Sequence, residues 1–250
     1  MMDLSGKNAV ITGGTRGIGR AIALDLAGCG ARVYALYARD RKSAEALEQE
    51  AGHKGLGIIT IRGDLARQET FQASVDQVKE ACETIDILVH AAASGVHKSA
   101  MELTDRHMRW TFDINFFAVH KLTVALIGKM KKGGRIIGVT SPGGERVIPH
   151  YAAIGASKGA LEALFRHYAR ELAPQGIMVN LVCPGMVMTD AAQAFPQLAE
   201  RLAMTLEYTP TGDLTRPEQV AALVRFLCSE EAKQIVGQTL VMDGGKGLLA

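Results

Sequence analysis

Two side chains in the stretch RVIPHYAAIGASKGA, residues 146–160, have the chemistry to act on an oxygen atom that gains negative charge. Tyr151 offers a phenolic hydrogen-bond donor, and Lys158 offers a cation. If the stretch is helical, their separation of seven places them within ~20° around the helix axis and ~10 Å apart along it, against ~6 Å for a separation of four. The two side chains would therefore share a face and border one bound molecule, with the phenol aimed at a different point than a tyrosine four residues before the lysine.

A glycine-rich turn near the start, VITGGTRGIG, follows an apolar run and precedes a helical pattern. Gly13, Gly17 and Gly19 allow the backbone to turn tightly and to approach a ligand closely. The free N–H groups and the positive dipole end of the following helix favour a pyrophosphate. This strand–turn–helix context predicts dinucleotide binding, and the alternative is a turn that serves packing alone.

Residues at the end of the second apolar run indicate which dinucleotide is bound. An acid at this point commonly binds the adenosine ribose of NAD. Here Tyr37 takes the position and Arg39 follows, while Arg16 lies in the glycine-rich turn, so two guanidiniums can bracket a 2′-phosphate. This favours NADPH over NADH, against the alternatives that Asp40 neutralises Arg39 or Arg41, or that Arg39 is only a solvated loop charge. Asp64, after the third run, either accepts from the adenine amino group or caps the next helix.

Short β-branched runs alternate with longer helical patterns along the whole chain. Most runs are continuously apolar, which is typical of strands buried on both faces of a parallel sheet. The alternation predicts an α/β fold, a single doubly wound domain over residues 1–250 with about seven parallel strands flanked by helices. The expected strands are 8–11, 31–36, 57–62, 85–90, 134–141, 177–183 and 238–242, and the expected helices are 17–29, 42–51, 67–83, 104–131, 152–173 and 217–229.

The segment at roughly 186–215 breaks this alternation and is rich in Met and Ala. In a doubly wound sheet, ligands bind beyond the carboxyl ends of the strands, so we expect the segment to be a substrate lid there. Its apolar side chains can line a tunnel for an acyl chain, and the alternative is an amphipathic helix packed on the body. The candidate lining residues are Met186, Met188, Phe195, Leu198, Leu202, Met204 and Leu206.

The composition argues against several classes of protein. The chain is 48% hydrophobic with a net charge of +2, which suits a packed core and disfavours a nucleic-acid-binding protein. There is no apolar run of 18 residues and no signal-peptide pattern, so we expect a cytoplasmic protein that does not span a membrane. The four cysteines lie far apart and are expected to be buried and reduced, and we expect no metal site.

Taken together, the motifs resemble those of the short-chain dehydrogenase/reductase family over essentially the whole chain. The resemblance implies a Rossmann-like fold, a nicotinamide cofactor and a homotetramer. The Tyr-x6-Lys spacing, with Ile154 where most members have the tyrosine, is similar to the NADPH-dependent enoyl-acyl-carrier-protein reductase III branch. The matching stretches are TGGTRGIG, GDL after the third run, Asn115 in DINFF, Ser141, AASGV, the YxxxGxSKxALEAL frame with Lys158, CPGMVMTD at 183–190, and GQT…DGG…LL.

The resemblance also implies roles for individual residues. The catalytic set is Tyr151, Lys158, Ser141 and Asn115. Ser141 either places substrate or bonds the backbone. Asn115 either holds a water molecule or Lys158 through its amide, or it only kinks a helix. Thr189 either binds the nicotinamide carboxamide or caps a helix. The cofactor set is Gly13, Thr15, Arg16, Gly17, Ile18, Gly19, Arg39, Asp64, Leu65, Ala92, Lys158, Pro184, Gly185, Val187 and Thr189. The substrate set is Ser94, Tyr151, Met186, Phe195 and Met204.

The shifted tyrosine leads us to expect reduction of the C2=C3 double bond of an enoyl thioester. In this reaction hydride reaches C3, and negative charge develops on the thioester oxygen. In ketone reduction, by contrast, the charged oxygen is bonded to the carbon that accepts hydride. The hydrogen-bond donor must therefore lie at a different place relative to the nicotinamide. The carrier would be acyl-carrier protein or CoA, in fatty-acid or polyketide-type synthesis. The alternatives are a 3-oxoacyl or other carbonyl reductase of the same family, and a non-catalytic NADP-binding sensor.

The chain also departs from the family pattern at several positions. It has His90 and Ala91 where Asn-Asn is common, and His150 precedes Tyr151. We expect a structural role for His90 and a surface position for His150, against the alternatives that each faces the cofactor or substrate. Pro184 matches the broader family rather than the enoyl reductase III branch, which leaves the exact substrate open.

Overall fold

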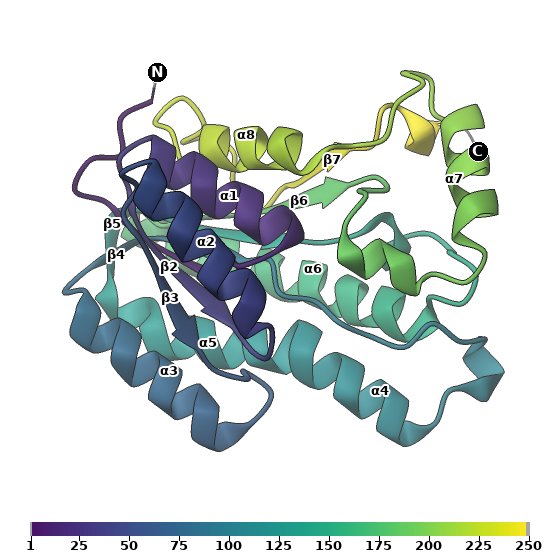
Figure 1. The fold of residues 1–250 in the computed structure, drawn as a ribbon, viewed down its shortest axis with the longest axis horizontal. Helices are drawn as coiled ribbons and strands as arrows, with labels where there is room; N and C mark the ends of the chain where they lie inside the picture. Colours follow the sequence, from purple (N-terminus) through teal and green to yellow (C-terminus); the bar gives the residue numbers. More distant parts are fainter. Residues whose placement is uncertain (1, 249–250) are drawn as a thin grey trace.

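Seven parallel strands form one sheet at the centre of the molecule (Figure 1). The computed structural model describes residues 2–248, without the side chains of residues 191 and 194. The strand order is β3-β2-β1-β4-β5-β6-β7, in which the direction of winding reverses between β1 and β4. This confirms the predicted doubly wound α/β fold. The strands are β1 Asn8–Thr12, β2 Arg32–Tyr37, β3 Ile58–Arg62, β4 Ile85–His90, β5 Met130–Val139, β6 Met178–Pro184 and β7 Thr239–Met242.

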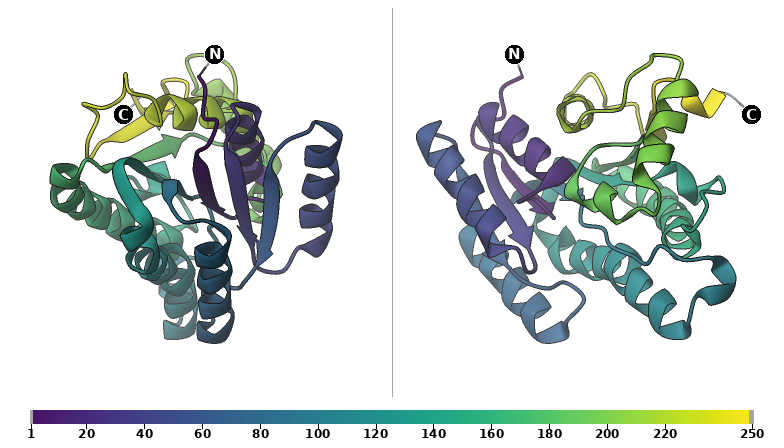
Figure 2. Two further views of the ribbon diagram at one scale, coloured as in Figure 1. Left: turned by 90° about the vertical axis from the view of Figure 1, so that its left-hand side faces the viewer. Right: turned by 45° about the vertical axis from the view of Figure 1, so that its right-hand side comes forward.

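Helices cover both faces of the sheet. Helices α1, α2 and α8 lie on one face, and α3, α5 and α6 lie on the other, with α4 continuing the line of α5 beyond the sheet (Figures 1 and 2). The helices are α1 Gly17–Gly28, α2 Arg41–His53, α3 Gln68–Ala81, α4 Asp105–Phe112, α5 Ala118–Leu126, α6 Ala152–Leu172, α7 Leu198–Glu207 and α8 Pro217–Leu227.

Apolar side chains on the two faces of the sheet form two separate cores. One core joins β1, β2 and β4–β6 to α3, α5 and α6 through residues such as Leu88 and Phe165. The other joins the opposite faces of the strands to α1 and α8 through residues such as Ile22 and Val224. Because the central strands are covered on both sides, their sequences are continuously apolar, as the sequence analysis assumed.

The long helix expected over 104–131 is wrong in two respects. Residues Asp113–Phe117 form a turn of π-helix between α4 and α5, and α5 ends at Leu126. Met130 already belongs to β5, where it is opposite Ile85, and the register then shifts so that Arg135 is opposite Ile87. The four residues between Met130 and Arg135 bulge from the ladder, and Gly133 adopts a φ of +95° there.

The segment after β6 lies over the carboxyl ends of the strands. It contains a short 3-10 helix, Asp190–Ala194, and helix α7, which stands at one end of the molecule beside the C-terminal segment (Figure 2). This agrees with the expected position of a lid. Between residues 2 and 248, we find no helix with both the length and the apolar content required to cross a membrane.

Candidate active site

A cleft with a volume of about 1240 Å³ opens at the carboxyl ends of the strands, beneath the lid segment. Its walls come from the segments that follow β1 to β6, from α6 and from the lid. Every residue predicted to hold the cofactor lines this cleft, and so does every residue of the predicted substrate set. The structure therefore brings together residues that lie up to about 190 positions apart in the chain, as expected where strand order reverses.

The glycine-rich turn after β1 is packed too tightly to accept side chains. A Cβ on Gly19 would lie 2.2 Å from the carbonyl oxygen of Gly13, and one on Gly13 would lie 2.9 Å from the Cα of Ala92. Gly13 and Gly17 also have φ values of +64° and +53°. The Thr189 methyl group lies 3.2 Å from where a Gly17 Cβ would be, so the lid meets the turn across the cleft. This geometry leaves the start of α1 open to a phosphate group.

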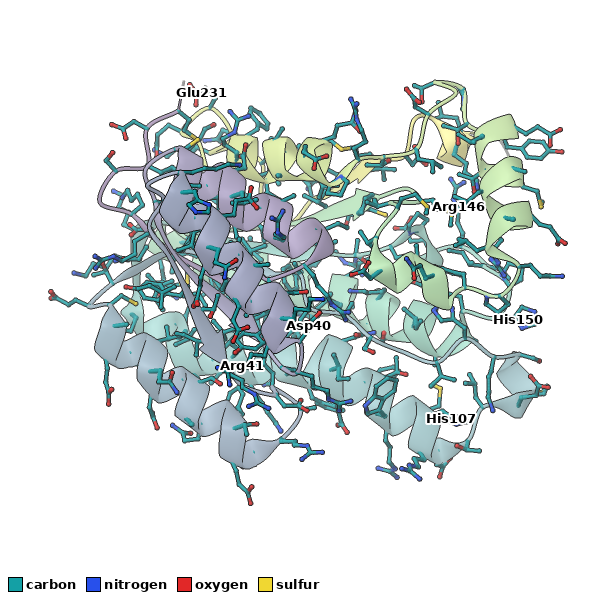
Figure 3. The ribbon with its side chains drawn as sticks, in the orientation of Figure 1. Asp40, Arg41, His107, Arg146, His150 and Glu231 are labelled. Carbon is teal, nitrogen blue, oxygen red and sulfur yellow. The ribbon has the colours of Figure 1, made fainter. Side chains whose placement is uncertain are left out.

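The two arginines expected at a 2′-phosphate are open to solvent at the adenosine end of the cleft. Arg16 is exposed, and 74% of the Arg39 side chain is accessible, with its guanidinium 3.6 Å from the Asp64 carboxylate. Asp40 does not neutralise Arg39, because its carboxylate accepts from the backbone N–H and hydroxyl of Ser43 and caps α2 (Figure 3). The arrangement fits a cofactor with an additional phosphate.

Asp64 does not cap the helix that follows it. Helix α3 begins at Gln68, with Arg67 at the N-cap position and no side-chain cap. The Asp64 carboxylate accepts from the backbone N–H of Ala66 instead and lies 3.7 Å from the Arg67 guanidinium. Of the two alternatives left open for Asp64, helix capping is therefore wrong.

Tyr151 immediately precedes α6, and several contacts hold it in place. Its backbone forms a parallel β-bridge with Lys98, and its carbonyl accepts from the Gly155 N–H at 2.7 Å. Its ring packs on Gly143, where a Cβ would come within 2.6 Å of the ring. Burial raises the pKa of the Tyr151 phenol, and a hydrogen bond with Ser141 partly opposes this effect. The phenol is therefore protonated at neutral pH and available as a donor.

Lys158 lies nearly two turns further along the same helix. Only 5% of the residue is exposed, and its ammonium donates to the carbonyl oxygen of Val139 at 2.8 Å. Burial lowers its pKa to about 8, and the nearby Glu162 carboxylate opposes this shift. Between the two residues, Ile154 is buried against Gly95, so an apolar side chain occupies the helix position from which most family members present their tyrosine.

Ser141 follows β5 by two residues and caps a short 3-10 turn, Pro142–Gly144. Its hydroxyl accepts from the Gly143 N–H at 3.3 Å and lies near enough to the Tyr151 phenol to lower its pKa. The backbone alternative for Ser141 is therefore confirmed, whereas its role in placing substrate stays a prediction, which its position in the cleft permits.

Asn115 does not hold Lys158. Its side-chain oxygen accepts from the Ser94 N–H at 2.9 Å, and its amide donates to the Ser157 hydroxyl at 2.9 Å. It is buried within the π-helical turn and does not itself line the cleft. Of the predicted catalytic residues, Asn115 is therefore the one that the structure assigns to positioning: it fixes the loop after β4 against α6.

Both histidines that depart from the family pattern lie where we expected them, although the exposed His150 also lines the cleft. His90 is buried and bonds the Thr123 hydroxyl through Nε2 at 3.0 Å, although its Nδ1 has no partner in the described structure. Burial lowers its pKa to about 3, so its role is structural. His150 is exposed at the edge of the molecule near α7, with a φ of +59° (Figure 3).

Four of the seven residues expected to line an apolar tunnel for an acyl chain do not line the cleft. Met186, Phe195 and Met204 line the cleft, whereas Met188, Leu198, Leu202 and Leu206 do not. Phe195 stacks on the Tyr151 ring, with centroids 5.7 Å apart and planes 11° from parallel. The alternative of an amphipathic α7 packed on the body is not confirmed either, because Thr205 is the only buried residue of α7 and Leu206 is exposed.

Two cleft residues were missed by the sequence analysis. Arg201 donates to the carbonyl oxygens of Pro149 and Pro196, and its guanidinium lies 5.4 Å from the centroid of the Phe195 ring. His97 packs its ring against Phe195, at 4.3 Å between centroids. Neither residue belongs to a motif, and only the fold of the lid over the loop after β4 brings them together.

Comparison with known proteins identifies the family. A family model described as "Enoyl-(Acyl carrier protein) reductase" matches residues 13–246. A short-chain dehydrogenase from Burkholderia cenocepacia, solved in complex with NADP, superposes with a TM-score of 0.90 at 35% identity, over 98% of this chain and 99% of that one. The chain belongs to the short-chain dehydrogenase/reductase family. It is an oxidoreductase of that type.

Curated relatives within the short-chain dehydrogenase/reductase family carry different activities. A 3-oxoacyl-[acyl-carrier-protein] reductase FabG of Haemophilus influenzae is 35% identical over 97% of this chain and 98% of its own length. A 1-cyclohexenylcarbonyl-CoA reductase of Streptomyces collinus is 32% identical over 97% of this chain and 87% of its own length. The FabG relatives match the carbonyl-reductase alternative better than enoyl reduction.

Proposed function

We propose that this short-chain dehydrogenase/reductase reduces the C2=C3 double bond of an enoyl thioester with NADPH. The observation that carries this proposal is the position of the phenol. Tyr151 lies at the start of α6, while Ile154 occupies the helix position four residues before Lys158. The donor in the cleft is thus displaced by about one turn from the position that ketone reduction uses in most of the family.

The displacement suits conjugate addition. NADPH, when bound, supplies hydride to C3 of the enoyl group. Tyr151 donates a hydrogen bond to the thioester oxygen, on which negative charge develops, and so lowers the energy of the enolate. Transfer of a proton to C2, from Tyr151 or from water, then completes the reduction. Ser141 lies beside the phenol, lowers its pKa and would help to orient it. Lys158 places a cation close to the same oxygen, in a site where burial strengthens the attraction.

The adenosine end of the cleft supports NADPH as the reductant. The tight turn at Gly13 and Gly19 accepts the pyrophosphate, and Arg16 and Arg39 are accessible to a 2′-phosphate. A solved relative from Burkholderia cenocepacia holds NADP, which supports the same choice.

Carbonyl reduction of a 3-oxoacyl thioester is the second candidate. The observation that favours it is the set of relatives named 3-oxoacyl-[acyl-carrier-protein] reductase. The neighbouring Ser141 and Tyr151 hydroxyls would also polarise a ketone. The carrier in either reaction would be acyl-carrier protein or CoA, and we place the enzyme in the cytoplasm as a homotetramer.

Paired assays distinguish the candidates. Oxidation of NADPH is followed with an enoyl thioester and, separately, with a 3-oxoacyl thioester of the same chain length and carrier. We expect turnover of the enoyl substrate and a lower rate with NADH. Turnover of the 3-oxoacyl substrate alone would establish the second candidate. NADPH binding without turnover of either substrate would indicate a sensor rather than an enzyme.

The variant Tyr151→Phe tests the role of the phenol. We expect it to lower kcat by at least ~100-fold with little change in NADPH affinity, because only the hydrogen bond to the developing charge is lost. Tyr208→Phe is the matched control, since Tyr208 is exposed beyond α7 and does not line the cleft. An unchanged rate in Tyr151→Phe would show that another group contacts the acyl oxygen.

A further inference from the structure

Glu162 is a buried carboxyl group outside the cleft. Only 3% of the residue is exposed, and it is absent from the residues that line the cleft. It follows Lys158 by four positions on α6, so the two side chains share one face of the helix about one turn apart. A buried carboxyl group destabilises the folded state unless its neighbours compensate it, so its position beside a buried cation requires an explanation.

The end of β5 contacts both side chains. The Lys158 ammonium donates to the carbonyl oxygen of Val139 at 2.8 Å, and the hydroxyl of the next residue, Thr140, donates to Glu162 Oε1 at 2.6 Å. The turn before α6 packs closely on the carboxyl group, because a Cβ on Gly144 would lie 2.8 Å from Glu162 Oε1. The strand end and the turn therefore keep the ammonium and the carboxyl group close to each other.

Several groups determine the ionisation of Glu162. Burial raises its pKa, and so does Glu145, whereas the Thr140 hydrogen bond, Arg166 and Lys158 lower it. A length of 2.6 Å is typical of a hydroxyl group that donates to an ionised oxygen. The contacts thus favour a carboxylate at this position.

Lys158 faces no other ionised side chain within residues 2–248. Two titratable groups on neighbouring strands lie near it, and both are neutral at pH 7. Burial lowers the pKa of His90 on β4 to about 3 and raises the pKa of Cys183 on β6 to about 12. The charge that stabilises the Lys158 cation therefore comes from Glu162.

We infer that Glu162 is a positioning residue, which acts through Lys158 and keeps that side chain positively charged while substrate is reduced. The inference rests on the proposed function, in which Lys158 places a cation close to the acyl oxygen. Burial favours loss of the Lys158 proton, and the carboxylate opposes this loss across one turn of the helix. The cation is therefore retained at a pH at which burial alone would neutralise it.

The pH dependence of kcat/KM tests the inference, with whichever thioester the enzyme reduces. In Glu162→Gln the side chain keeps its size and an oxygen acceptor for Thr140 but loses its charge. We expect the alkaline limb, near pH 8 in the wild type, to move to a lower pH by about one unit. A purely structural role would lower the rate at every pH and leave the limb in place, which would overturn the inference.

Two variants provide the controls. Thr140→Val/Glu162→Leu replaces both hydrogen-bonding groups by apolar groups of similar size, which a protein core commonly tolerates, and should move the limb in the same direction. Glu171→Gln removes a charge near the exposed end of α6, outside the cleft, and should keep the wild-type limb. An equal displacement of the limb in Glu171→Gln would overturn the inference.

A titration without substrate separates this inference from the proposed function. Lysine side chains are isotope-labelled at Cε for NMR, and the Lys158 signal is identified by its loss in Lys158→Arg. We expect its midpoint near pH 8 in the wild type and about one unit lower in Glu162→Gln. Equal midpoints would overturn the inference, whereas a lack of turnover with any acyl thioester would overturn the proposed function alone.

Discussion

Lys158 combines burial with a positive charge, and this has a consequence for the pH dependence of the enzyme. Its ammonium lies against the Val139 carbonyl, and burial lowers its pKa from 10.5 to about 8. The buried Glu162 carboxyl, one turn away, favours the charged form and accepts from the Thr140 hydroxyl at 2.6 Å. The cation that the mechanism uses is therefore lost at a pH well below that of an exposed lysine.

We predict that kcat/KM falls as pH rises through about 8, because Lys158 loses its proton there. The Tyr151 phenol cannot cause this limb, since burial raises its pKa. Lys158→Arg keeps a charge at every accessible pH, so its profile should lack the limb even if its rate is lower. Rate profiles between pH 6 and 10 for both proteins give the comparison. A limb near pH 8 in Lys158→Arg would assign it to another group.

Residue-level reasoning from the sequence succeeded where a motif fixes both residue type and position. The residues of the glycine-rich turn, Ser141, Tyr151 and Lys158 all line one cleft, as expected. It failed for Asn115, whose amide is occupied by Ser94 and Ser157, because sequence spacing does not show which partner a buried amide finds. The packing of His97 against Phe195 could not be predicted either, since it depends on contacts between distant segments.

At the scale of elements, the contact between α6 and the turn Pro142–Gly144 aligns the reacting groups. The two elements meet through glycines, because a Cβ on Gly155 would lie 2.4 Å from the Gly143 carbonyl oxygen, and one on Gly159 would lie 2.9 Å from that of Gly144. This close approach sets the distance between Ser141, on the turn, and Tyr151, at the start of the helix. The contact could not be predicted from the sequence, since these glycines match no phosphate-binding pattern.

Substitution of Gly155 by alanine should therefore separate the two elements. We expect a loss of about 1–3 kcal/mol in the free energy of unfolding, as for other overpacked sites, together with reduced turnover. Gly52→Ala is the matched control within a helix, because its Cβ would meet nothing within 4 Å. That variant should be more stable by about 0.5–1 kcal/mol, the difference in helix propensity. Urea unfolding measures both, and changes of the same sign would contradict the steric explanation.

The boundaries of most elements followed from the sequence, and the exceptions have local causes. Strands such as β4 were predicted to the residue because continuous apolar runs end at polar residues. The helix expected over 104–131 was wrong because periodicity alone does not reveal a π-helical turn or the pairing of Met130 with Ile85. Both depend on neighbours distant in the chain.

At the scale of the whole molecule, α4 and α5, on the side of the sheet opposite α1 and α8, carry exposed apolar side chains. Trp110, Phe117 and Val124 are exposed along the run from α4 to α5. Exposed large apolar side chains in one region commonly mark an interface between subunits. This surface supports the proposed homotetramer, which a single chain does not itself display.

We predict that the wild type sediments with the mass of four 26.7 kDa chains and that Val124→Asp dissociates it at least in part. A carboxylate buried in an apolar interface loses its hydration without gaining a partner. Met101→Asp makes the same kind of change at an exposed site outside this run and should not affect assembly. Analytical ultracentrifugation of the three proteins provides the test, and a monomeric wild type would refute it.

The two hydrogen bonds from Arg201 tie the lid to the peptide just before Tyr151, through Pro196 and Pro149 respectively. Because Pro149 lies two residues before Tyr151, Arg201 couples the position of the lid to that of the phenol, so a displacement of the lid would also displace the proposed donor.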